Sequence, residues 1–240
     1  MDKYKVMSWG PAVGRGATGS QHLHLAAIGK SNSPDSFFYI INEVISAEVG
    51  RRLRLPVPPS CTVQDAEGKP FFASLNFLLT GDSLPPIVPD QFFQTFGEQC
   101  CDIVVFDAYI ANPDRHPANL SADYADQPRF NLFDHSHALL GPGRDVAAKL
   151  LALENDIGLG GHCLKGVLRD DRPFEKMLSR VEHLEDYFIR DVVSDIQEYG
   201  LNDDEVTLLT TFLLNRRQKV RELIAGNKHQ FPAIAQWSLL

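Results

Sequence analysis

A stripe of apolar residues that runs into a polar, proline-bounded loop restricts the possible folds most strongly in this sequence. Its members recur every four positions and so predict one buried helix face: Phe92, Phe96, Cys100, Val104 and Ala108. The helix is expected to break near Gly97 and to end at Asn112-Pro113, because a residue before proline avoids the helical conformation. The loop then displays four polar residues: Asp114, Arg115, His116 and Asn119.

A further carboxylate, Asp134, follows the loop at the end of an apolar strand, residues 130–133. A short hairpin-like excursion separates it from Asn119, so the two side chains are expected to meet. Such oxygen ligands suit magnesium, which usually takes one or two carboxylates together with substrate phosphates. Asp114 and Asp134 in one small site would repel each other by ~1–4 kcal/mol at about 4 Å. A divalent ion between them is therefore expected.

The first third of the chain is expected to contain strands around one helix. A glycine cluster at 14–20 indicates a tight turn, and partial alternation over 21–28 indicates a strand. A helix with an N-cap region at 33–36 is expected to end near Arg54, before a proline-rich stretch. Strand, turn and strand should follow between residues 61 and 77.

The rest of the chain is expected to be mainly helical after a proline-bearing linker at 80–89. Residues 174–199 favour helix, and Asn202 with Glu205 predicts a capping box at the start of another. The fold class is therefore α+β with two lobes. We expect a small sheet-rich N-lobe at 1–79 and a helical C-lobe at 80–240.

Composition narrows the function classes. The formal net charge of −8 gives no basic footprint for nucleic acid. The longest apolar run, residues 103–110, is too short to span a bilayer, and the N-terminus has no apolar signal region. Four cysteines without framework spacing are expected to be reduced thiols. A cytoplasmic protein that binds neither nucleic acid nor membrane is expected.

The loop and strand resemble the catalytic segment of HipA-like kinases and, more distantly, of phosphatidylinositol kinases. In those families an Asp-x-x-x-x-Asn loop precedes a strand that ends in a metal-binding Asp. The resemblance rests on Asn112-Pro113-Asp114-Arg115-His116, with Asn119 and Asp134. It implies a protein kinase-like fold and a phosphotransferase that uses ATP and Mg²⁺. Asp114 would accept the proton of the substrate hydroxyl, while Asn119 and Asp134 would hold the metal on the nucleotide phosphates.

The resemblance extends upstream over about residues 10 to 140. It implies that a glycine turn with Gly14, Gly16 and Gly19 lies near the nucleotide and that Ser74 lies in the hinge beside the adenine. Glu43 would pair with a phosphate-binding lysine. The strand where the family carries this lysine has none, and the candidate is Lys30, just past Gly29. The family's acceptors imply that the partner is a protein with a Ser or Thr hydroxyl.

Several alternatives stay open. Without a working Lys30, ATP binding would be weakened, and the chain would be a nucleotide-binding pseudokinase acting as an interaction module. A third hypothesis is a metal-dependent phosphohydrolase that uses Asp114, Asp134 and histidines. The catalytic candidates Arg115 and His116 could touch the transferring phosphate or only hold the loop by packing, and Asp107 is expected to brace the loop. The pairs His22/His24 and His135/His137 are candidate zinc ligands.

Overall fold

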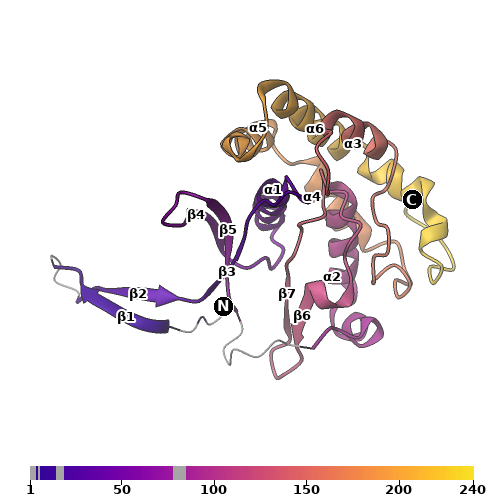
Figure 1. Ribbon diagram of the computed structural model, residues 1–240. Helices are drawn as coiled ribbons and strands as arrows, with labels where there is room; N and C mark the ends of the chain where they lie inside the picture. Colours follow the sequence, from indigo (N-terminus) through magenta and orange to yellow (C-terminus); the bar gives the residue numbers. More distant parts are fainter. Residues whose placement is uncertain (1–3, 5, 15–18, 78–84) are drawn as a thin grey trace.

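The computed structural model describes residues 4, 6–14, 19–77 and 85–240. Two small antiparallel sheets and one helix form the first third of this part, and helices dominate after residue 89 apart from one hairpin (Figure 1). The mixed helical and sheet composition expected from the sequence is confirmed. The division into lobes at residues 1–79 and 80–240 stays a prediction.

A three-stranded sheet carries the residues that matter most in the first third. β3 (Ala27–Lys30), β5 (Pro70–Leu75) and β4 (Ser60–Gln64) are antiparallel, with β5 in the centre. The expected strand, turn and strand between residues 61 and 77 are thus confirmed. Lys30 pairs with Phe72 and ends β3. Residues two apart share one face of a strand, so Lys30 lies on the same face as Ile28.

β1 (Val6–Ala12) and β2 (Gln21–Leu25) form a separate antiparallel hairpin that projects from the body of the molecule (Figure 1). The expected strand over 21–28 is therefore divided at Ala26, because β2 pairs with β1 whereas β3 pairs with β5. The sequence did not reveal this change of partner, which depends on contacts with distant strands rather than on local alternation.

Helix α1 (Tyr39–Arg52) is buried along most of its length, including the polar side chains of Asn42 and Glu43. It begins later than the expected N-cap region at 33–36. No side chain at its N-cap accepts a hydrogen bond, but Asn32 Oδ1 accepts one from the Ile40 amide at 3.1 Å. Asn32 thus satisfies one of the amides that the first helical turn leaves unpaired.

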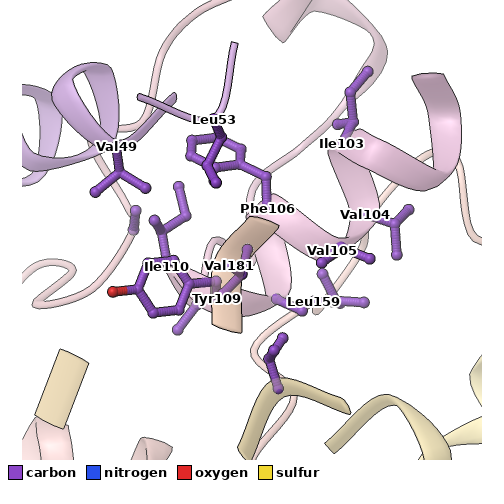
Figure 2. Packing of buried hydrophobic residues seen from close by; sticks show 14 of the residues in the cluster. Val49, Leu53, Ile103, Val104, Val105, Phe106, Tyr109, Ile110, Leu159 and Val181 are labelled. Carbon is purple, nitrogen blue, oxygen red and sulfur yellow. The ribbon is translucent and has the colours of Figure 1, made fainter. Parts of the chain in front are cut away.

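Helix α2 (Pro89–Tyr109) forms the centre of the hydrophobic core. The expected break occurs at Phe96, which has φ −125° and ψ 40°, next to Gly97. Figure 2 shows Val49 and Leu53, from the end of α1, gathered over Phe106 of α2. Full burial of one such side chain stabilises the fold by ~1.5–3 kcal/mol, so these contacts hold α1 firmly against α2.

The remaining elements complete the core around α2. β6 (Leu120–Asp123) and β7 (Arg129–Leu132) form the expected hairpin. Four helices follow: α3 (Val146–Leu153), α4 (Phe174–Glu182), α5 (Asp186–Asp195) and α6 (Asp203–Gly226). Short 3₁₀ turns occupy Pro117–Asn119, Gln197–Tyr199 and Lys228–Gln230. The capping box of Asn202 and Glu205 is present as predicted.

Within the described ranges, no helix has the length and apolar character needed to cross a membrane.

Candidate active site

The polar loop after α2 is anchored by a buried ion pair between Asp107 and Arg115. Both side chains are completely buried, and the Arg115 Nε lies 2.8 Å from Asp107 Oδ2. Asp107 also accepts hydrogen bonds from Asn112 Nδ2 at 2.9 Å and lies 3.0 Å from His162 Nε2. Burial opposes the charge of Asp107, but Arg115 and His162 outweigh it and keep its pKa well below the ordinary value. Asp107 therefore braces the loop, as expected.

Arg115 also holds the end of the loop and the segment before Asp134 in place. Its Nη1 donates to the carbonyl oxygens of Asn119 and Phe133, at 3.0 and 2.8 Å. These carbonyls belong to the loop and to the residue immediately before Asp134. The contacts of Arg115 therefore match the packing alternative rather than direct contact with a phosphate, because its guanidinium is turned into the interior.

A second charged cluster joins β3, α1 and the residue after β7. Lys30 Nζ lies 2.6 Å from Glu43 Oε1 and 2.6 Å from Asp134 Oδ1. Ser136 Oγ donates within the same cluster, 2.9 Å from Glu43 and 2.8 Å from Asp134. Asp134 itself has φ 60°, a left-handed conformation that a residue with a side chain rarely adopts. Lys30 thus joins the two carboxylates from a position displaced to the end of its strand.

Charge pairing governs the titration of this cluster. Burial alone would raise the pKa of Glu43, but His135 and Lys30 outweigh it and lower that pKa to about 2. Burial likewise opposes the charge of Lys30, and Glu43 with Asp134 reverses the effect and raises its pKa. At neutral pH the cluster therefore holds one ammonium between two carboxylates.

This titration predicts a loss of stability in acid. Because the pKa of folded Glu43 lies below the unfolded value of 4.5, the unfolded chain takes up this proton first as pH falls. The contribution, on the order of 3 kcal/mol, is complete above about pH 4.5 and is lost as pH falls toward 2. Chemical denaturation should show Glu43→Gln less stable than wild type at pH 7, with a gap that narrows below pH 4.5. An equal gap at every pH would contradict this pairing.

Two adjoining cavities meet at the charged cluster. The first, of about 450 Å³, is lined mainly by apolar side chains of the three-stranded sheet, β6 and the segment after β7, including Ile28, Phe72 and Leu120. The second, of about 330 Å³, is polar and is lined by Asp114, among others. Lys30 and Asp134 line both cavities. Asp114 and Asp134 therefore line one common cavity.

The structure brings together most of the expected site residues. Ser74 and Glu43 line the apolar cavity, as do Lys30 and Asp134. Asn119 lines neither cavity; it is buried at the base of the loop, where its Nδ2 donates to the Asp114 carbonyl at 2.8 Å. The apolar lining of the larger cavity was not foreseen in detail from the sequence.

Other expected site residues lie elsewhere. His116 is exposed, and its Nδ1 accepts a hydrogen bond from the Ala118 amide at 3.2 Å, which caps the short turn Pro117–Asn119. Gly14 and Gly19 lie beyond the strand ends of the β1–β2 hairpin and line neither cavity. Gly16 lies outside the described residues. The two described glycines, Gly14 and Gly19, therefore belong to a hairpin that projects away from the sheet bearing Lys30 (Figure 1).

A segment some 40 residues after the loop packs against the loop backbone. The sequence did not predict this contact. Gly158 and Gly160 have positive φ, 73° and 33°, and pack against the loop backbone. The Cys163 amide donates to the Arg115 carbonyl at 2.8 Å. His162, in the same segment, contacts Asp107. Their signal was weak: the only mark in the sequence is the group Gly158-Leu159-Gly160-Gly161-His162.

This packing predicts a steric effect at Gly158. A methyl group there would lie 2.7 Å from Ala111 Cα, and φ of 73° adds backbone strain. Gly158→Ala should therefore lower the free energy of unfolding by ~1–3 kcal/mol. Gly161→Ala is the matched control, because no atom lies within 4 Å of its added methyl group. Urea denaturation of both variants checks this prediction. Equal stabilities would show that the loop adjusts to the added methyl group without loss of stability.

The described residues contain no group of three or more His, Cys, Asp or Glu side chains arranged to hold a metal ion. His22 and His24 are exposed on the projecting hairpin, and His24 Nδ1 lies 2.6 Å from Ser8 Oγ. His135 is buried beside Glu43, and the ring of His137 packs edge-on against Tyr39. These pairs therefore do not combine into one site.

Comparison with known proteins identifies the fold. No protein-family model matches the sequence, and no curated protein matches it. A solved structure described as a Helicobacter pylori proinflammatory kinase, CtkA, matches with TM-score 0.56 and 15% identity, over 90% of this chain and 94% of that one. A HipA chain from a Shewanella oneidensis MR-1 complex with HipB and operator DNA matches with TM-score 0.47 and 14% identity, over 85% of this chain and 61% of that one. The expected resemblance to a HipA-like kinase is confirmed at the level of the fold.

Proposed function

We propose that this chain is an ATP- and Mg²⁺-dependent kinase of the HipA-like type, which transfers the γ-phosphate to a Ser or Thr hydroxyl of a protein. One observation carries the proposal: Lys30, Glu43 and Asp134 form one charged cluster at the meeting point of an apolar and a polar cavity, and Asp114 lines the polar one. A kinase needs this combination, because catalysis of phosphoryl transfer is almost entirely positioning and charge stabilisation.

The larger cavity suits a nucleobase. Its walls are apolar on both sides, with Ile28 and Phe72 from the sheet and Leu120 and Phe133 from the opposite side. Ligand cavities of this size are typically apolar with a few placed polar groups. Ser74 lies on the central strand of the sheet, at the position proposed for the hinge. The adenine would lie here, with its phosphates directed toward Lys30.

The polar cavity suits the reacting groups. Asp114 is half-buried, and its carboxylate has no hydrogen bond or ion pair with any residue in the described part of the chain. It is therefore available to accept a proton from an incoming hydroxyl. Lys30 would contact the phosphates while Glu43 holds it in place. Arg115 acts as a positioning residue through the carbonyls of Asn119 and Phe133.

The donor set at the same place fits magnesium. Asn119 uses its amide nitrogen on the Asp114 carbonyl, and its side-chain oxygen, for which no hydrogen bond is found within the described residues, would be the ligand. Asp134 adds a carboxylate that is 39% exposed and turned toward the cavities. One carboxylate and one amide oxygen, completed by water and phosphate, is the set that Mg²⁺ usually takes. When bound, the ion would neutralise charge on the phosphates.

A pseudokinase is the second candidate, and one observation favours it: the β1–β2 hairpin projects from the body of the molecule (Figure 1), and none of its described residues lines either cavity. In that case the chain would bind nucleotide and act as an interaction module without turnover. The pairing of Lys30 with Glu43 argues against it, because the missing strand lysine was its main support.

Incubation with γ-labelled ATP, Mg²⁺ and a host lysate tests the proposal. We expect label on a protein, at serine or threonine, that disappears when EDTA removes the metal. Binding of ATP without transfer to any protein or to the chain itself would instead identify a pseudokinase. Release of phosphate from simple monoesters without nucleotide would favour a phosphohydrolase.

A further inference from the structure

A basic cavity at the C-terminal end of α1 shares no lining residue with the proposed nucleotide site. It has a volume of about 490 Å³ and is lined by Arg52 and Arg54 at the end of α1 and by Arg180 and His183 at the end of α4. Glu185 is its one acidic lining residue. With His183 neutral, three arginines and one glutamate leave two net positive charges, although the whole chain carries −8.

The three arginines differ in how many hydrogen bonds and ion pairs they form with other residues of the chain. Arg52 is paired with Glu185 through two hydrogen bonds. Arg180 donates one long hydrogen bond, 3.3 Å, to the Leu53 carbonyl, and its charge also interacts with the buried carboxyl of Asp102. The Arg54 guanidinium has no hydrogen bond or ion pair with the part of the chain that the structure describes. Two of the three arginines therefore retain free donors toward the cavity.

The backbone at Arg54 has a conformation that is strained for a residue with a side chain. The Leu55 amide donates to the Gly50 carbonyl and the Arg54 amide to the Arg51 carbonyl, at 2.9 and 3.0 Å. This is the Schellman arrangement that ends a helix, and Arg54, with φ 64°, holds its left-handed position. Glycine is the usual residue there because it has no side chain to strain. An arginine in that place lines the cavity despite the backbone strain.

We propose that this cavity binds a phosphoryl dianion through Arg54 and Arg180. The two net charges of the lining match those of such an anion, and arginine forks bind phosphate with paired, charge-assisted hydrogen bonds. The ligand is either free phosphate or a phosphorylated side chain, which share this chemistry. The proposal does not depend on kinase activity.

Thermal unfolding of the full chain, at constant ionic strength and without nucleotide, tests this proposal. Inorganic phosphate at about ten times its Kd should raise the ratio of folded to unfolded wild type about elevenfold. Arg54→Gly should fold at least as well as wild type, since glycine suits the backbone there, but should weaken phosphate binding about tenfold or more. Arg54→Lys, which keeps the charge but not the fork, should lie between them.

Two matched variants separate a local site from general charge. Arg180→Gln should weaken phosphate binding, whereas Arg190→Gln, an exposed helix arginine outside the cavity, should not. A serine peptide and its phosphoserine form distinguish the sources: stabilisation by the phosphopeptide at lower concentration than by phosphate identifies a phosphorylated side chain. No phosphate-dependent shift in wild type, or equal shifts in wild type, Arg54→Gly and Arg180→Gln, would overturn the proposal.

Discussion

Asp114→Asn should reduce phosphotransfer by ~10²–10⁴-fold, the usual contribution of a positioned general base. The amide keeps the size of the side chain but cannot accept the proton of the substrate hydroxyl. Because the carboxylate of Asp114 makes no contact that supports the described structure, the variant should unfold at the same temperature as wild type and bind ATP·Mg²⁺ equally well.

The measurement is the initial rate of label transfer from ATP at saturating Mg²⁺. Asp123→Asn is the matched control, since within the described residues the half-exposed side chain of Asp123, at the end of β6, contacts only the Arg129 side chain and the Ala125 amide, and it lines neither cavity. Its rate should equal that of wild type. If Asp114→Asn transfers phosphate at the wild-type rate, Asp114 is not the base.

Arg115→Met should be the most destabilising substitution considered, lowering the free energy of unfolding by ~3–5 kcal/mol. The methionine fills much of the space but leaves the fully buried Asp107 without its charged partner. It also removes the donors to the Asn119 and Phe133 carbonyls, so the loop and the segment before Asp134 lose their connection.

Urea denaturation at pH 7 measures this loss. Arg129→Met removes an arginine from an ion pair with Asp123 in which both partners are more than 40% exposed. Pairs of that kind contribute ~0–1 kcal/mol, so the two variants should differ severalfold. A similar small effect for both would mean that Asp107 is solvated or neutral in the folded protein.

The local patterns predicted much of the site because its parts are short and regular. The apolar stripe that recurs every four positions from Phe92 to Ala108 predicted α2, and the apolar run before Asp134 predicted β7. The polar loop between them follows from Asn112-Pro113, where a helix must stop. The pairing of Lys30 with Glu43 followed from the resemblance, although the lysine is displaced to the end of its strand.

What escaped prediction depends on tertiary contacts. His162 and Gly158 reach the loop from a segment with no periodicity, and only the folded chain brings them to Asp107 and Ala111. The direction of the β1–β2 hairpin is set where the chain changes partner at Ala26, not by the glycines themselves. α3 was also missed, because a cap at Asp145 follows directly on a glycine- and proline-bearing stretch.

The central claim is that Asn119 and Asp134 hold one divalent cation beside Lys30 and Asp114. Crystals grown with Mn²⁺ and a non-hydrolysable ATP analogue test this most directly, because Mn²⁺ takes the same oxygen ligands as Mg²⁺ and gives an anomalous signal. The account predicts an anomalous peak within ~2–2.3 Å of an Asp134 carboxylate oxygen and the Asn119 side-chain oxygen, with the nucleotide base in the apolar cavity. Bound nucleotide with its metal away from both residues would contradict it.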